Sequence, residues 1–171
     1  MRQEMITWNE VDQLIDHLIP QLDKEFDALL MITCGGIIPG GMLAEAMHIN
    51  QILTASVNFP SEMHTPTAAD KHKLAAWPYY LQFPEDSLVK GKKILVVDDV
   101  WGTGRTINAV RSRLSGMAAY PFTCVLHFNP HRNLFAPARP NYYAAITDAF
   151  IVYPWEISRG PEGILPGNPS C

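Results

Sequence analysis

Residues 94–106, ILVVDDVWGTGRT, decide the fold of this chain. Four branched apolar residues, typical of a strand buried on both faces of a parallel sheet, lead into two adjacent carboxylates, Asp98 and Asp99. A turn rich in glycine and threonine follows, and INAVRSRL then has the spacing of a helix. Because open α/β sheets bind ligands at the carboxyl ends of their strands, we expect the acidic pair to lie in a binding site.

The turn at residues 102–106 is suited to a phosphate group. Its backbone N–H groups can point inward, and the positive N-terminus of the following helix adds to the attraction for an anion. Asp98 and Asp99 can accept hydrogen bonds from sugar hydroxyls or organise the ligand shell of Mg²⁺. The stretch therefore predicts a ligand with a ribose-like diol, a phosphate and Mg²⁺. A Walker-type loop and the dinucleotide fingerprint G-x-G-x-x-G are both absent from it.

Strand-like and helix-like segments alternate along the rest of the chain. The patterns predict a helix from a cap at Thr7 or Asn9 to about residue 22, and further helices at 40–47 and 107–114. Strands are expected at 26–33, 52–59, 94–97 and 122–128, with shorter pieces at 144–145 and 150–152. The alternation predicts an α/β fold with a mostly parallel central sheet.

The order of strand, acidic pair, T-G-x-T turn and helix resembles the phosphoribosyl pyrophosphate (PRPP) motif of type I phosphoribosyltransferases. The resemblance implies their α/β fold, a mostly parallel sheet flanked by helices with a small C-terminal hood. It also implies Mg²⁺ as cofactor, PRPP and a purine base as partners, and Asp98 and Asp99 as catalytic residues. The residues that it assigns to PRPP binding are Asp98, Asp99, Gly102, Thr103, Gly104, Arg105 and Thr106.

A second strand, glycine turn and helix occur in LLMITCGGIIPGGMLAEAM, residues 29–47. This segment resembles the pyrophosphate loop of the same family, especially of bacterial xanthine–guanine enzymes, and the resemblance assigns Cys34, Gly35 and Gly36 to that loop. A cation often precedes the two glycines in those enzymes, whereas this chain has Cys34. Backbone donors would then have to hold the pyrophosphate. The alternative is that the glycines only allow a strand and a helix to pack closely.

A third segment, DAFIVYPWE at residues 148–156, resembles the hood of the purine enzymes. The resemblance places Phe150 on the face of the base and gives Ile151 and Val152 the role of backbone readers of its edge. It places Glu156 near the metal together with Asp99. The alternative is that the aromatic residues here belong to the core or to an edge strand.

The identity of the base depends on less direct signals. The segment VLHFNP puts Asn129 where xanthine–guanine relatives have a lysine that bonds the 6-oxo group. An asparagine amide can donate the same bond, so we expect a 6-oxopurine such as hypoxanthine, guanine or xanthine. Gly102 stands where hypoxanthine–guanine enzymes often have an aspartate, so this loop supplies no general base. Cys34 and Gly102 together leave open a second function, a PRPP- or nucleotide-binding regulator with little or no turnover.

The resemblance also implies how the chain is organised. We expect one domain over residues 1–171, with a core at about 27–130, a flexible lid at about 60–84 and a hood at about 131–171. The lid would carry Lys71, His72 and Lys73 toward the pyrophosphate, and Trp77, Tyr79 and Tyr80 would anchor it to the body.

Composition excludes several classes of protein. The 171 residues carry a net charge of −4 and contain no basic tract, so nucleic acid is not an expected partner. No apolar run approaches a membrane span, and the first residues lack the pattern of a signal peptide. Three scattered cysteines without a C-x-x-C pair fit reduced thiols, so we expect a cytoplasmic protein. A homo-oligomer, dimer or tetramer, is also expected.

Overall fold

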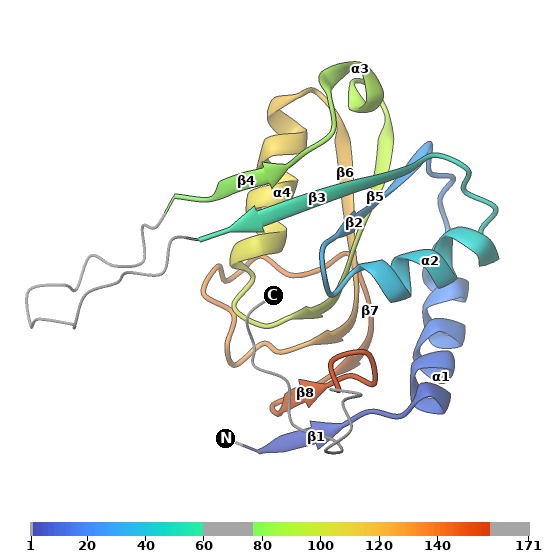
Figure 1. Cartoon of the computed structure of the whole chain (residues 1–171), viewed down its shortest axis with the longest axis vertical. Helices are drawn as coiled ribbons and strands as arrows, with labels where there is room; N and C mark the ends of the chain where they lie inside the picture. Colours follow the sequence, from blue (N-terminus) through green and yellow to red (C-terminus); the bar gives the residue numbers. More distant parts are fainter. Residues whose placement is uncertain (1, 60–76, 158–171) are drawn as a thin grey trace, which may run out of the picture.

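The computed structural model describes residues 2–59 and 77–157, and Figure 1 shows how their elements are arranged. The elements in chain order are β1 (Gln3–Met5), α1 (Trp8–Leu18), the 3-10 turn η1 (Ile19–Gln21), β2 (Ala28–Ile32), α2 (Ile37–Ala46), β3 (Ile52–Asn58), β4 (Tyr79–Gln82), α3 (Asp86–Val89), β5 (Lys93–Trp101), α4 (Arg105–Gly116), β6 (Tyr120–Phe128), β7 (Tyr142–Ile146) and β8 (Phe150–Val152). No helix of the described residues is long and apolar enough to cross a membrane.

The main sheet has six strands in the order β4-β3-β2-β5-β6-β7. Its strands are parallel except at one edge, where β4 runs antiparallel to β3. β2 and β5 are the central pair, and all of β2 and residues 94–97 of β5 are apolar and buried, as expected for strands covered on both faces. The predicted α/β fold with a mostly parallel sheet is confirmed.

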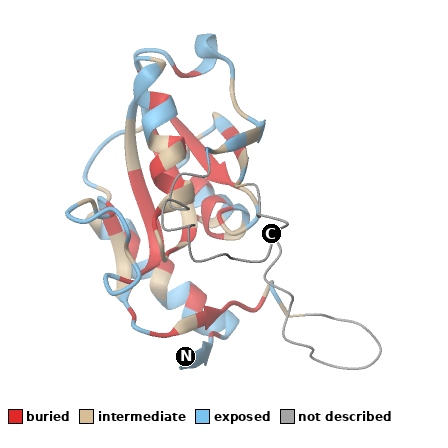
Figure 2. Cartoon of the chain, turned by 90° about the vertical axis from the view of Figure 1, so that its left-hand side faces the viewer, coloured by how far each residue is buried: buried red, intermediate tan, exposed pale blue. Residues whose placement is uncertain are grey.

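Helices cover the two faces of this sheet. On one face α1 and α2 pack on a cluster that includes Leu29, Leu95 and Leu126. On the other face α4 packs on Leu30, Val96 and further residues of the neighbouring strands. Figure 2 shows that buried residues follow the strands and the helix surfaces turned toward them.

The first helix begins as its sequence predicts. The Thr7 hydroxyl accepts a hydrogen bond from the backbone N–H of Glu10, and the Glu10 carboxylate accepts one from the backbone N–H of Thr7. This reciprocal capping box satisfies two N–H groups that a helix end leaves unpaired. α2, in contrast, begins at Ile37, three residues before the predicted start. The segment Pro39-Gly40 forms its first turn, where a proline needs no hydrogen-bond partner.

β5 is longer than the four apolar residues that predicted it. It continues through Asp98 and Asp99 to Trp101, because β6 pairs with it as far as Trp101 and Phe128. On its other side β2 stops pairing at Met31 and Val97. The acidic pair therefore lies beyond the carboxyl end of β2 but inside β5, and it is still at the edge of the sheet that was expected to bind a ligand.

The hood differs from its predicted boundaries. β7 pairs with β6 in the main sheet, so residues 142–146 belong to the core and not to the hood. β8 instead pairs with β1, and the two form a separate parallel sheet that joins the two ends of the described chain. A three-residue strand at residues 3–5 is too short to produce a period-2 pattern, which is why the sequence did not predict it.

The predicted lid at 60–84 lies only partly within the described residues, which exclude Lys71, His72 and Lys73. Its last part forms β4. Tyr80 packs as an anchor, with its hydroxyl donating to the carbonyl of Ala109 at 3.0 Å and the Arg113 guanidinium 4.2 Å from its ring centroid. Trp77 and Tyr79 were expected to do the same but are 85% and 62% exposed. Tyr79 points to the face of β4 opposite Tyr80, because alternate side chains of a strand point to opposite faces, and Trp77 lies before the strand.

Candidate active site

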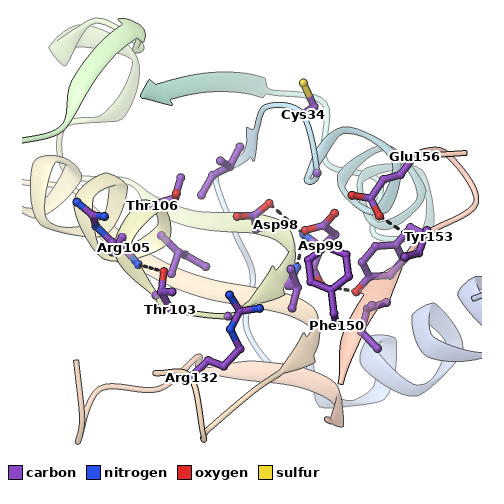
Figure 3. A pocket seen from close by; sticks show the side chains of 18 of the residues that line it. Cys34, Asp98, Asp99, Thr103, Arg105, Thr106, Arg132, Phe150, Tyr153 and Glu156 are labelled. Carbon is purple, nitrogen blue, oxygen red and sulfur yellow. Dashed lines mark hydrogen bonds between the residues drawn. The ribbon is translucent and has the colours of Figure 1, made fainter. Parts of the chain in front are cut away.

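A cavity of about 570 Å³ opens at the carboxyl edge of β2 and β5, and its wall includes all seven residues assigned to PRPP binding (Figure 3). The wall also includes Cys34 and Gly35 from the turn after β2, and Phe150, Ile151, Val152 and Glu156 from the hood. The three segments that the sequence singled out therefore meet in one place. Two predicted residues, Gly36 and Asn129, do not line the cavity.

The loop between β5 and α4 has the shape of an anion site. Gly104 has a φ of +79°, a left-handed conformation that favours glycine, and it caps a helix of twelve residues. The first N–H groups of such a helix lack intrahelical acceptors and carry the positive end of its dipole. Thr103 lies beside them and accepts a hydrogen bond from the N–H of Arg105 at 3.4 Å.

Arg105 brings a positive charge to the same wall. Its guanidinium carbon lies 4.5 Å from the ring centroid of Phe59, which holds the group flat. Its Nη2 atom is buried and has no hydrogen-bond acceptor among the described residues. The Arg105 side chain lines the cavity. Because a buried donor without an acceptor is costly, this donor favours a ligand that offers an oxygen acceptor.

Asp98 and Asp99 are largely shielded from solvent, and their negative charges repel each other. Asp98 and Asp99 each use Oδ1 to accept the N–H of the next residue, at 3.1 Å and 2.6 Å. Burial, with a contribution from the charge of Glu156, raises the pKa of Asp99 to about 7. Burial and the charge of Asp99 raise the pKa of Asp98 well above its ordinary range. Negative charge crowded in this way favours a nearby cation.

Two buried residues hold the backbone of the acidic pair in place. The Tyr153 hydroxyl donates to the backbone carbonyl of Asp99 at 3.0 Å, and Nδ1 of His127 lies 2.8 Å from the same hydroxyl. Since the hydroxyl has one proton and gives it to the carbonyl, Nδ1 of His127 must carry a proton and donate to the hydroxyl. The ring of Tyr153 stacks on Trp155 at 4.6 Å between centroids. The hood is thus bonded directly to the strand that carries the carboxylates.

The turn after β2 contributes Cys34 and Gly35 to the cavity, while Gly36 lies behind them. A side chain at Gly36 would collide with the carbonyl oxygen of Val97, so this glycine allows the turn between β2 and α2 to pack against β5. Close packing, the alternative considered for these glycines, thus applies to Gly36. The Thr33–Cys34 peptide bond is cis, and the Cys34 side chain is exposed.

The backbone groups of Ile151 and Val152 face opposite sides of β8. The N–H of Phe150 donates to the carbonyl of Arg2, and the carbonyl of Val152 accepts from the N–H of Ile6, both in the pairing with β1. Successive residues of a strand direct their backbone groups to opposite sides. The N–H and carbonyl of Ile151 therefore point away from β1, whereas those of Val152 serve the small sheet.

Asn129 is buried and does not line the cavity. Only 1% of it is exposed. Its Oδ1 accepts from the N–H groups of His131 and Arg132 at 3.1 Å and 3.2 Å, and its Nδ2 donates to the carbonyl of Ala149 at 3.4 Å. Its amide is therefore committed to the turn after β6. From that turn Arg132 enters the cavity wall.

Sequence reasoning did not single out several residues of the wall, which include Gln3, Arg132, Tyr153 and Trp155. Gln3 arrives through the pairing of β1 with β8, which has no sequence signal. Arg132 had one signal: Asn129, three residues before it, forms a turn through its side chain, and such turns fix the direction of the next residues.

Residues 3–134 match the family of the phosphoribosyl transferase domain. The chain belongs to this family. The resemblance to type I phosphoribosyltransferases is thereby confirmed, and the chain is a phosphoribosyltransferase by family.

Known relatives agree with this placement. An adenine phosphoribosyltransferase from Pseudothermotoga lettingae is 34% identical over 119 residues, which cover 66% of this chain and 67% of that protein. The chain spans about half to two thirds of the length of the curated relatives it matches. The fold is similar to that of a purine phosphoribosyltransferase from Pyrococcus horikoshii, with a TM-score of 0.75, 24% identity and coverage of 94% of this chain and 98% of that one. It is also similar to a xanthine-guanine-hypoxanthine phosphoribosyltransferase from Helicobacter pylori, with a TM-score of 0.73, 14% identity and coverage of 91% and 94%.

Proposed function

We propose that this protein transfers a phosphoribosyl group from PRPP to a ring nitrogen of a purine and releases pyrophosphate. The observation that carries the proposal is that an acidic pair, a helix N-terminus and an aromatic hood residue open on one cavity. A purine nucleotide offers a group for each of them: a ribose diol, a 5′-phosphate and a flat base. The bond from the sugar to pyrophosphate breaks, the bond from the sugar to the purine nitrogen forms, and the proton of that nitrogen passes to the released pyrophosphate.

Each part of the wall has a separate task in this proposal. The α4 N-terminus with Thr103 and Thr106 holds the 5′-phosphate, and Asp98 and Asp99 face the sugar. Phe150 stacks on the base. The N–H groups near Cys34 and Gly35 hold the pyrophosphate. As positive charge develops on the sugar, the two carboxylates stabilise it, and the loop contributes no side-chain base. Most of the rate acceleration then comes from positioning and charge.

The donor set fits Mg²⁺. Asp99 and Glu156 supply hard oxygen ligands, and after burial the charge of Glu156 is the next contribution that raises the pKa of Asp99, so the two carboxylates act on each other. The described residues contain no cluster of three metal-binding side chains. Mg²⁺ suits such a site because it keeps water and substrate oxygens as ligands beside one or two carboxylates. When bound, it neutralises pyrophosphate, and we propose Asp99 and Glu156 as its nearest protein ligands.

Two observations point to different purine bases as the substrate. The relatives are named adenine phosphoribosyltransferases. We propose a 6-oxopurine instead, because the cavity wall includes an arginine, Arg132, which can donate hydrogen bonds but cannot accept them. The experiment is a panel of adenine, hypoxanthine, guanine and xanthine with PRPP and Mg²⁺, read by pyrophosphate release. Turnover that needs PRPP, Mg²⁺ and a purine is the expected result.

The second candidate is a PRPP- or nucleotide-binding regulator. It is favoured by one observation, that the turn expected to carry a cation for pyrophosphate places Cys34 in the cavity wall. Binding of PRPP by calorimetry without pyrophosphate release from any purine or pyrimidine would support the regulator and contradict the enzyme.

We also propose that the chain forms a homo-oligomer. Tyr79 and Leu81 share one face of the edge strand β4 and are 62% and 59% exposed, and Trp77, shortly before the strand, is 85% exposed. Apolar rows on edge strands are normally covered, and a second copy of this chain would cover this one. Light scattering is expected to give a multiple of 19.1 kDa, which Leu81→Lys reduces. A monomeric unmodified protein would contradict this proposal.

A further inference from the structure

Most of the cavity wall does not choose between purines. The backbone unit of Ile151 carries one donor and one acceptor, which point away from β1. A 6-oxopurine presents a donor at N1 and an acceptor at O6, and adenine presents the reverse pair at N1 and its amino group. A backbone unit can pair with either edge, and so can an amide such as Gln3. Selection therefore needs a side chain that only donates or only accepts.

Asn129 does not supply that side chain. Both of its amide atoms bond to backbone groups of residues 131, 132 and 149, and it is 1% exposed. Its effect is indirect, because accepting the N–H groups of His131 and Arg132 bends the chain after β6. The bend brings Arg132 into the cavity wall.

The two residues that follow Arg132 are hydrogen-bonded to the end of β5 and to the phosphate loop. The residue two positions further, Leu134, donates its N–H to the carbonyl of Thr103 at 3.1 Å. Asn133 accepts a hydrogen bond from the indole of Trp101 at 3.2 Å. The start of the connection between β6 and β7 is thus held by Asn129, and the next residues are held by their bonds to the PRPP motif. In Figure 3 the Arg132 side chain points into the cavity, and in this view its guanidinium lies between Thr103 and Phe150.

Among residues 2–59 and 77–157, no ion pair involves the Arg132 guanidinium. It has five N–H donors in a rigid fork and no acceptor, so it satisfies two neighbouring acceptors at once and repels a donor. O6 and N7 of a 6-oxopurine are such a pair of acceptors, as they are when arginine reads guanine in DNA. Adenine offers an amino group in place of O6.

We propose that Arg132 is the residue that selects a 6-oxopurine, by donating hydrogen bonds to O6 and N7 of a base stacked on Phe150. The proposal rests on the proposed function, because the site that it completes is the purine site of that reaction. It places the ring nitrogen that is to be alkylated, which lies on the side of the base opposite O6, toward the sugar and the acidic pair.

The test measures binding and turnover separately. Dissociation constants of the monophosphates of hypoxanthine and adenine are determined by calorimetry for the unmodified protein and for Arg132→Gln. The kcat/KM values of hypoxanthine and adenine are determined by pyrophosphate release. Arg139→Gln is the matched control, because Arg139 is an exposed arginine of the same β6–β7 connection that does not line the cavity.

We expect the unmodified protein to bind the hypoxanthine nucleotide more tightly than the adenine nucleotide. Arg132→Gln is expected to weaken binding of the hypoxanthine nucleotide by about 10- to 100-fold and to leave the dissociation constant of the adenine nucleotide nearly unchanged. In turnover, the KM of hypoxanthine rises while the KM of PRPP stays the same. Arg132→Lys keeps part of the preference, since it retains donors but not the fork, and Arg139→Gln changes nothing.

Three results would overturn the proposal. One is equal binding of the two nucleotides by the unmodified protein. The second is an equal loss for both nucleotides in Arg132→Gln, which would place Arg132 on the phosphate that they share. The third is an Arg132→Gln variant that keeps the full preference for the hypoxanthine nucleotide. If nucleotide preference follows Arg132 but no base gives pyrophosphate, the proposed reaction fails and the role of Arg132 in selection stands.

Discussion

The carboxylate of Asp99 fills the space that a side chain at Gly35 would need. A Cβ atom added to Gly35 would lie 2.5 Å from both Cγ and Oδ1 of Asp99. The carboxylate has little room to move away, because Asp99 is 8% exposed and its Oδ1 accepts the N–H of Val100 at 2.6 Å. The turn that was predicted to hold pyrophosphate is therefore in direct contact with the acidic pair.

Gly35→Ala is expected to displace the Asp99 carboxylate. Since a shift of about 1 Å in a reacting group can cost roughly 100-fold in rate, we expect kcat/KM for PRPP to fall by about 10- to 100-fold. Gly41→Ala is the control, because a Cβ there meets nothing within 4 Å and alanine favours the α2 helix by about 1 kcal/mol. Unchanged kinetics in a folded Gly35→Ala protein would show that Asp99 does not need its present position.

Gly104→Ala is expected to weaken binding of both PRPP and nucleoside monophosphate, because both carry the 5′-phosphate. The new Cβ would lie 2.5 Å from Nε1 of the fully buried Trp101, and the φ of +79° is unfavourable for alanine. Calorimetry with each ligand measures the effect, and Gly116→Ala, at an open position of the same helix, is the control. A loss confined to PRPP would show that the loop holds pyrophosphate instead.

Phe150→Ala tests the stacking role of the hood. Loss of an aromatic stacking partner is expected to raise the KM of the purine by roughly 5- to 150-fold and to leave the KM of PRPP unchanged. Phe150→Tyr keeps the ring and is expected to retain most of the affinity. Equal increases in both KM values, together with a lower melting temperature, would instead make Phe150 a packing residue of the β1–β8 sheet.

His127 is expected to make stability depend on pH. Burial lowers its pKa below the ordinary value of 6.5, and the charge of Glu4 offsets part of that shift. Above 6.5 the imidazole is neutral in the folded and the unfolded protein. As the pH falls below that value the unfolded chain takes up the proton first, so the free energy of unfolding decreases until the lowered pKa is reached.

His127→Gln removes this titration but keeps a donor for the Tyr153 hydroxyl. Denaturant unfolding at about pH 7.5 and about pH 5.5 is expected to show a larger loss of stability in the unmodified protein than in the variant. Because the other histidines are common to both proteins, the difference reports on His127. Parallel losses would mean that this imidazole accepts a proton in the folded protein as readily as in the unfolded one.

The sequence was most informative where local pattern and chemistry coincide. The run before Asp98, the glycine turn and the amphipathic spacing after it predicted β5, its loop and α4 within a few residues. The same reasoning failed where position depends on a partner far away in the chain. β5 extends beyond its apolar residues because β6 pairs with it along its whole length, and Gln3 lines the cavity because β1 pairs with β8. Asn129 and Arg132 show the limit most clearly: residue type indicated a polar base contact, but only the direction of one turn shows which of the two side chains faces the cavity.

Because β1 pairs with β8, the parts of the site form in a defined order during synthesis. Residues 3–5 leave the ribosome long before residues 150–152, and until then the first strand has no partner. β2, β5 and α4 lie between them in sequence and close over shorter spans of chain, which costs less entropy. The half of the cavity that we propose to bind the 5′-phosphate can thus form on a nascent chain that still lacks the half that we propose to bind the purine. Under the proposed function, the growing polypeptide would be able to bind a sugar phosphate before it could bind a base.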